Sequence, residues 1–177
     1  MEAAAGDGVG EWVMFVVNRP VQALQLVNGF ARSPALYRNN NRIKSLKLSF
    51  VVGFTAPGLV SELDYYLYFL TDLKQVELVL EDTLEPQPLD FPISYEEHEK
   101  LVWDALQEFY DAYPFFMREI EKDLGVGPNI GKEQLRQLQE EIFAAFGMSC
   151  LRLEILEVYP GTRYQDTCLS EISTIFE

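Results

Sequence analysis

The stretch NGFARSPALYRNNNRIKSLK, residues 28–47, is basic and rich in amides, whereas the chain around it is acidic. The protein has 177 residues and a formal net charge of −14, yet residues 12–61 contain no Asp or Glu. Apolar runs flank the stretch, residues 12–17 before it and 43–54 after it. Because binding residues are often carried on polar loops held between strands, the pattern predicts a loop presented at one end of a β structure.

This loop has two interpretations. Asn tolerates left-handed backbone and caps its own turn, so the asparagines fit turn chemistry. Asn amides and Arg guanidinium groups also form hydrogen bonds in fixed directions, and a nearby Tyr offers an apolar face, which is the combination a sugar needs. A variant of the first interpretation makes Arg38, Asn40 and Arg42 buried partners that pin the loop, with the binding site elsewhere on the same rim.

Short strand-like runs on both sides of the loop indicate an all-β sandwich. Residues 42–54 alternate best between apolar and polar side chains. A turn is predicted at residues 18–20, and Thr71 and Asp72 are predicted to separate two strands. The other expected strands cover residues 10–17, 20–28, 63–70, 74–80, 85–92, 150–158 and 167–175.

Residues 94–147 have a helical pattern and interrupt the strands. Ser94 and Glu97 fit a capping box at the start, Pro114 is expected to break or kink the first helix, and residues 132–146 form a second helix that Gly147 ends. The segment carries twelve acids and five bases, which are expected to form a solvated face. The domain prediction is therefore a sandwich of residues 1–93 and 148–177 with a helical insertion at residues 94–147.

Composition excludes several function classes. A pI near 4.4 argues against nucleic acid as a partner, and no apolar run approaches the length of a membrane span. Cys150 and Cys168 lie outside any metal-binding motif and are expected to be buried free thiols. His98 is expected on the polar surface of a helix, without the positioned partners that catalysis needs. The protein is predicted to be non-enzymatic.

The sequence resembles the NADase-type glycan-binding domains, which are relatives of the discoidin and galactose-binding jelly rolls. The resemblance covers residues 6–92 and 150–172 and is clearest in the closing run YPGTRYQDTCLSEI. The other matching residues are GVGEW at 8–12, residues 27–30, Leu36, Tyr37, Asn40 to Lys44, Leu80 to Asp82 and Gln87.

The resemblance implies a β-sandwich whose loops at one end bind carbohydrate, and a location at the cell surface, in the periplasm or outside the cell. The first residues, MEAAAGDGVG, carry no signal-peptide pattern. Related domains open with an Asp-Gly-Asp loop that supplies most ligands of a structural calcium, and this loop is not expected here. Glu171 looks like the Glu that completes such a site, with Asp166 or Asp7 as a possible second ligand; alternatively it is a surface carboxylate.

Two functions follow. The first is a non-catalytic carbohydrate-binding module, in which Tyr37 or Tyr164 stacks on a sugar and polar side chains bond its hydroxyl groups; the excess of Arg would favour anionic glycans. Its predicted ligand-binding residues are Arg32, Tyr37, Arg38, Asn39, Asn40, Arg163 and Tyr164. The second is a protein-interaction module that uses the acidic, aromatic helices. Its docking face would consist of the apolar residues left over once one helix face has packed: Tyr110, Phe115, Phe116 and Met117. Alternatively, these residues fill the seam against the sandwich.

Overall fold

The computed structural model describes residues 6–17 and 20–176, so Asn18 and Arg19 of the predicted turn lie outside the described residues. The described chain is mainly β, which confirms the predicted jelly-roll sandwich class. Its strands are β1 (Trp12–Val16), β2 (Val21–Asn28), β3 (Asn41–Phe54), β4 (Phe69–Val79), β5 (Gln87–Asp90), β6 (Gly147–Tyr159) and β7 (Thr167–Phe176). Its helices are α1 (Pro34–Asn39), α2 (Tyr95–Ala112), α3 (Pro114–Asp123), α4 (Lys132–Gln137) and α5 (Gln139–Phe146).

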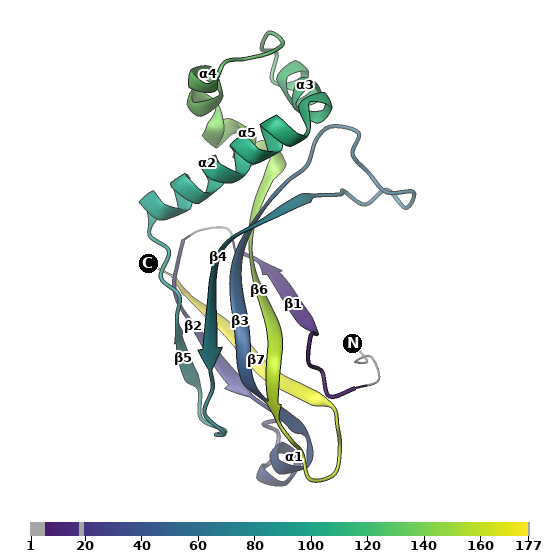
Figure 1. Cartoon of the computed structure of the whole chain (residues 1–177), viewed down its shortest axis with the longest axis vertical. Coiled ribbons are helices and arrows are strands. Elements are labelled where there is room, and N and C mark those ends of the chain that lie inside the picture. Colours follow the sequence, from purple (N-terminus) through teal and green to yellow (C-terminus); the bar gives the residue numbers. More distant parts are fainter. Residues whose placement is uncertain (1–5, 18–19, 177) are drawn as a thin grey trace.

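The strands form two antiparallel layers (Figure 1). One layer has the order β4-β3-β6-β1, and the other has the order β5-β2-β7. A short parallel pairing joins them, in which Asn41 and Arg42 of β3 meet Thr167 and Cys168 of β7. The junction lies next to α1, so the stretch at residues 28–47 is anchored where the two layers meet.

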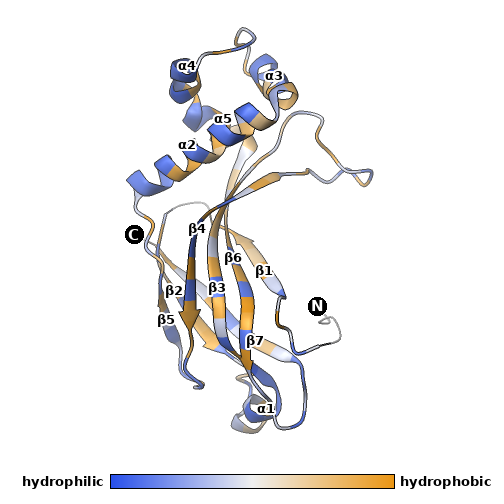
Figure 2. Ribbon diagram, viewed as in Figure 1, coloured by the Kyte–Doolittle hydropathy of each residue, from blue (hydrophilic) through white to orange (hydrophobic). Residues whose placement is uncertain are grey.

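Alternating side chains build the core between the layers. Leu46, Leu48 and Phe50 of β3 are at most 1 % exposed, as are Leu24 and Leu26 of β2. Hydrophobic residues accordingly follow the strand interiors, and polar residues gather at the turns and on the helices (Figure 2). The alternation in the sequence therefore predicted the buried face of β3 correctly.

Helices α2, α3, α4 and α5 lie between β5 and β6 and cover one end of the sandwich, whereas α1 lies at the other end (Figure 1). Ser94 caps α2 by accepting a hydrogen bond from the Glu97 amide at 3.1 Å, and Pro114 starts α3, as the sequence predicted. The prediction of only two helices was wrong, because residues 132–146 are divided at Leu138 into α4 and α5. Phe54 and Phe69 of the sheet stack on Phe109 and Tyr113 of the cap, so helices and sandwich share one core.

Two local predictions were wrong. Residues 63–70 were expected to be a strand, but β4 begins only at Phe69 and runs without a break through Thr71 and Asp72. The preceding residues form a projecting loop closed by a bridge between Val60 and Tyr66. Helix α1 was also missed, although the Ser33-Pro34 pair is an N-terminal signal: the Ser33 hydroxyl caps the Leu36 amide, and Pro34 occupies the first turn.

Candidate functional site

The loop between β6 and β7 packs against the last turn of α1. The amide of Thr162 donates to the carbonyl oxygen of Arg38 at 3.0 Å, and the amides of Arg163 and Tyr164 donate to the carbonyl oxygen of Asn39 at 3.1 and 2.8 Å. Gly161 permits this approach, because an added Cβ would lie 2.5 Å from the same Asn39 oxygen. Two segments far apart in sequence are thus held as one surface.

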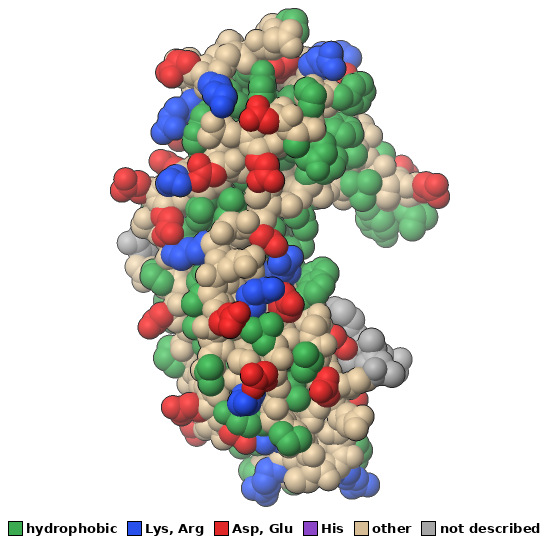
Figure 3. All heavy atoms as spheres, viewed as in Figure 1, with side chains coloured by type: hydrophobic (Ala, Val, Ile, Leu, Met, Phe, Trp, Pro, Cys, Tyr) green, Lys and Arg blue, Asp and Glu red, His purple; other side chains and the backbone are tan. Residues whose placement is uncertain are grey.

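The two segments carry the exposed side chains of Arg38, Arg163 and Tyr164, and Arg32 is exposed just before α1; we call these four residues the arginine rim. The guanidinium carbon of Arg163 lies 5.2 Å from the centroid of the Tyr164 ring, so the two side chains pair by a cation–π contact. None of the three arginines has an ion-pair partner within the described part of the chain. Basic side chains are visible at the end of the molecule that carries α1 (Figure 3).

Tyr37 points away from this surface. Its side chain is 6 % exposed, and its hydroxyl group donates to Asp82 Oδ1 at 2.7 Å. Gly29 makes room for the ring, since a Cβ there would lie 2.6 Å from the Tyr37 ring carbons. A ring packed in this way has no face left for a sugar, so the predicted stacking role does not fit Tyr37.

Arg42 is the centre of a polar network next to the rim, in which Arg42 and Tyr37 are buried and Asp82 is partly exposed. Its Nε and Nη2 atoms donate to the two carboxylate oxygens of Asp82 at 3.0 and 2.7 Å, and Nη1 donates to the carbonyl oxygens of Asn40 and Pro160, each at 3.0 Å. The hydrogen bond with Asp82 raises the pKa of Arg42, and the same contact lowers the pKa of Asp82. Burial, with the Asp82 contact second, raises the pKa of Tyr37 to about 12.

The asparagines hold the loop in place. The Asn40 amide donates to the carbonyl oxygen of Leu36 at 2.7 Å and closes α1. Asn41 donates to the carbonyl oxygen of Gln165 and accepts from the Gly161 amide, and Asn39 accepts from the Thr162 hydroxyl group. The turn interpretation therefore describes these contacts, and the pinning role holds for Asn40 and Arg42 but not for the exposed Arg38.

Sequence reasoning missed two residues of this network. Asn28 is fully buried and forms a two-way amide contact with the backbone of Ile43, which ties the end of β2 to β3. Asp82 lies 40 residues from Arg42 along the chain. In the sequence, Asp82 stood out only as part of the run Leu80 to Asp82 that matches the resembled family, and the run gave no indication that Asp82 pairs with Arg42.

The carboxylates considered for calcium do not converge. Asp166 and Glu171 are five positions apart along an extended segment, which corresponds to roughly 16 Å, whereas calcium ligands lie 2.3–2.6 Å from one ion. Asp7 uses its carboxylate to accept from the Val9 amide. Within residues 6–17 and 20–176, no group of three or more His, Cys, Asp or Glu side chains is placed to hold a metal. The ideal spacing of an extended segment is unfavourable for Asp166 and Glu171 as ligands of one ion, and the role of Glu171 as a calcium ligand stays a prediction.

His98 and the cysteines differ in part from their predictions. His98 is half-buried rather than on the surface: its ring lies 5.7 Å from those of Phe50 and Phe143, and Nε2 is 2.9 Å from the Ser149 hydroxyl oxygen. Burial lowers the pKa of His98. Both cysteines are free thiols, but only Cys150 is fully buried, and burial raises the pKa of both thiols.

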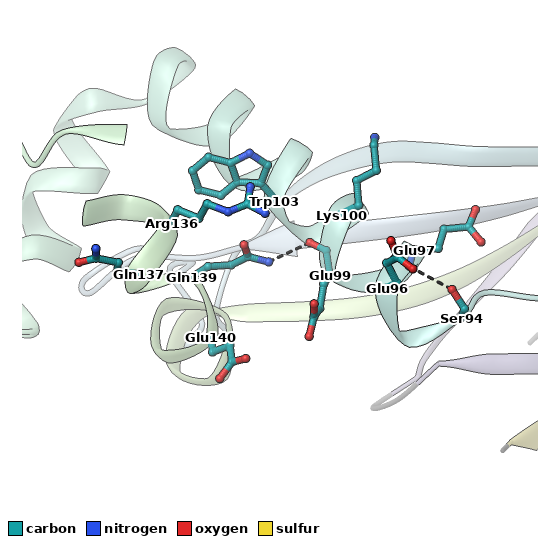
Figure 4. Close-up of a pocket in the computed structure, with 10 residues that line it drawn as sticks. All are labelled: Ser94, Glu96, Glu97, Glu99, Lys100, Trp103, Arg136, Gln137, Gln139 and Glu140. Atoms are coloured by element: carbon teal, nitrogen blue, oxygen red, sulfur yellow. Dashed lines mark hydrogen bonds between the residues drawn. The ribbon is translucent and has the colours of Figure 1, made fainter. Parts of the chain in front are cut away.

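The helical cap contains a groove of about 860 Å³ between α2 and the pair α4–α5 (Figure 4). The Arg136 guanidinium lies over the Trp103 ring at 5.3 Å, and Gln139 donates to the carbonyl oxygen of Glu99. Of the apolar residues predicted for a docking face, Met117 is buried, Phe116 is half-buried and the Tyr110 hydroxyl group donates to Ile130. Only Phe115 is well exposed, at 61 %.

Residues 1–96 match the family described as NAD glycohydrolase translocation F5/8 type C domain. The chain belongs to this family. No curated protein and no solved structure matches it. The match makes this translocation-type domain a discoidin-like module, in agreement with its sandwich, and it includes α1, Arg42 and Asp82 of the network described above. No helix of the described chain is long and apolar enough to cross a membrane.

Proposed function

We propose that this domain is a non-catalytic module that binds glycans at the arginine rim. The observation that carries the proposal is the exposed cation–π pair of Arg163 and Tyr164, on a loop whose backbone is bonded to that of α1 at the exposed Arg38, in a protein of net charge −14. The family description, which concerns translocation, supports a role other than catalysis.

The arrangement suits an anionic sugar. Arg forms paired hydrogen bonds with carboxylate and sulfate groups, and Tyr164 supplies an apolar face for a sugar ring. The polar network supports both, because Arg42 and Asn41 fix the backbone of the β6–β7 loop. The proposed contact residues are thus Arg32, Arg38, Arg163 and Tyr164, with Tyr37, Asn39 and Asn40 as structural supports.

A glycan array followed by titration calorimetry tests the proposal. We expect binding to sialylated or sulfated glycans that weakens with added salt, and a loss of about tenfold or more for Arg163→Ala and for Tyr164→Ala. The matched control is Arg118→Ala, an exposed arginine on α3, which should leave affinity unchanged. If Arg163→Ala and Tyr164→Ala bind the glycan as tightly as the wild type and the Arg118→Ala control do, the rim is excluded as the site.

A second candidate function is protein docking through the helical end. Phe115 is 61 % exposed, and on the nearby β3–β4 loop Leu63, Tyr65 and Tyr66 are 76, 69 and 69 % exposed. Aromatic side chains are enriched in protein interfaces. Deleting the helices would expose the core that they share with the sheet, so the double variant Phe115→Asp, Tyr65→Asp is the better test. Once a protein partner is identified, loss of its binding by this variant together with intact glycan binding would favour docking.

A further inference from the structure

An apolar cleft of about 380 Å³ opens on one side of the sandwich between β1 and β7. Ile43, Leu46, Leu153 and Ile155 line it from the core side, and the first three of them are at most 3 % exposed. Residues 11–13 form one border and residues 167–172 form the other. The cleft is separate from the arginine rim and from the groove in the helical cap, since it shares no lining residue with either.

The cleft follows the backbone of β7. Six consecutive residues of this strand line it, although successive side chains of a strand point to opposite faces. A cleft that touches all six must therefore run along the edge of the strand. β7 pairs with β2 on its other edge and with β3 only at Thr167 and Cys168, so residues 169–175 have no second strand beside them in the described structure.

The opposite border is also an open edge. β1 pairs with β6, and no other described strand pairs with it. Trp12 and Val13 on this border are 60 and 38 % exposed, although both are apolar. Two unpaired strand edges thus border one apolar cleft. An unpaired edge is a template for another strand, and an apolar cleft accepts every second side chain of that strand.

The charges of the cleft define its occupant further. Among the residues that the structure describes, the only carboxylates lining it are Glu11 and Glu171, and no Lys or Arg lines it. Neither carboxylate has an ion-pair partner among the residues the structure describes. We infer that the cleft binds an extended segment of a partner protein, in which apolar residues alternate with polar ones and a Lys or Arg meets Glu11 or Glu171.

A second copy of the chain fits the cleft less well than a basic segment. Pairing through β1 would bring two molecules of net charge −14 together, and like charges oppose association. The negative net charge of the chain attracts a basic segment and so favours its binding. The inference goes beyond glycan binding and depends on no residue of the rim except through the common fold.

The test begins with a displayed library of random ten-residue peptides selected on the intact chain. We expect the enriched peptides to alternate apolar and polar residues and to contain Lys or Arg. A synthetic copy should lose about tenfold in affinity when a central residue becomes Pro, because Pro removes an amide donor. Enrichment of peptides without alternation, or of none at all, would overturn the proposal.

A charge exchange locates the site. Glu171 is exposed, so Glu171→Lys should fold normally. The variant should bind a Lys-containing peptide with lower affinity than the wild type, and the affinity should be restored when that Lys of the peptide is replaced by Glu. Arg118→Ala is the control. Hydrogen exchange on the wild-type chain should show slower amides in Trp12–Val16 and in residues 169–175 when the peptide is bound. Protection confined to other segments, or the same protection produced by a dimer seen in ultracentrifugation, would contradict the assignment.

Discussion

The two ends of this sandwich are closed by different interactions. At the end with α1, the buried Arg42 and Tyr37 and the partly exposed Asp82 form a polar network with hydrogen bonds of 2.7–3.0 Å. At the helical end, Phe54 and Phe69 pack against aromatic residues of α2 and α3. Aromatic packing stabilises the fold mainly through the apolar area that it buries, whereas the polar network stabilises it only when donors and acceptors are correctly oriented.

The difference explains which end presents ordered groups. Hydrogen bonds fix the orientation of backbone and side chains, so the network holds α1 and the β6–β7 loop in one relative position. The backbone positions of the arginine rim are fixed in the same way, because the rim is carried by these two segments. The aromatic end gains stability from its area and leaves Phe115 and the β3–β4 loop exposed. The stability of the two ends should therefore respond differently to substitution and to pH.

The largest effect is expected at the aromatic end. Phe54 is 1 % exposed and lies 5.6 Å from Phe109, centroid to centroid. Phe54→Ala should lower the free energy of unfolding by about 3–5 kcal/mol, because it leaves a cavity between sheet and cap. Urea unfolding measures this. Phe115→Ala, at an exposed position, should change it by less than about 0.5 kcal/mol. A loss for Phe54→Ala as small as that for Phe115→Ala would show that the cap is not part of the core.

A smaller loss is expected at the polar end. Asp82→Asn leaves the Arg42 guanidinium group buried without its counter-charge, which costs about 3–5 kcal/mol in a fully buried pair. We expect about 2 kcal/mol, because the Asp82 side chain is 38 % exposed. The control is Glu157→Gln, which removes an exposed pair with Lys44 and should cost less than about 0.5 kcal/mol.

The same pair gives a pH dependence with a defined sign. The pKa of Asp82 is lowered by Arg42, so its stabilisation is present above the ordinary pKa of Asp, near 3.9, and is lost as the pH falls through the folded-state value. Acid unfolding of Asp82→Asn should lack this component. An unchanged acid profile would mean that the pair is not formed in solution.

His98 should give a still smaller effect at milder pH. Burial lowers its pKa, so the folded state favours the neutral ring and loses stability as the pH falls below about 6.5. We expect His98→Gln to reduce the difference in unfolding free energy between pH 7.5 and pH 5.5 by about 0.5–1 kcal/mol. An equal pH difference in both proteins would place His98 in water, as the sequence suggested.

The smallest effect is expected for calcium. The ideal spacing of Asp166 and Glu171 along an extended segment is unfavourable for sharing an ion, so calcium and chelator should give melting temperatures within about 1 °C of each other. A filled site at a hundredfold excess over its Kd would add about 2.7 kcal/mol to the free energy of unfolding. A rise of several degrees with calcium would show that a calcium site exists and would restore Glu171 as a candidate ligand.

Local patterns were sufficient to predict much of the architecture. The alternation in β3, the cap at Ser94, the break at Pro114 and the end at Gly147 were all predicted, because each depends on neighbours within a few residues. Predictions failed where distant contacts override local preference. β4 continues through Thr71 and Asp72 because β3 pairs with it along this region, with a bulge at Phe50 and Val51.

The sequence by itself determined that a helical segment interrupts a β protein, that Leu46, Leu48 and Phe50 of β3 are buried, and that the stretch at residues 28–47 is basic. Only the tertiary structure decided which polar residues of that stretch face inward. Tyr37 and Arg42 are buried because Asp82, 45 and 40 residues away, meets them at the junction of the two sheets. Arg38 stays exposed, since its helix turns it away from that carboxylate and toward solvent. The physical reason is that burying a charge requires a partner, and partners are brought together by the fold rather than by spacing along the chain.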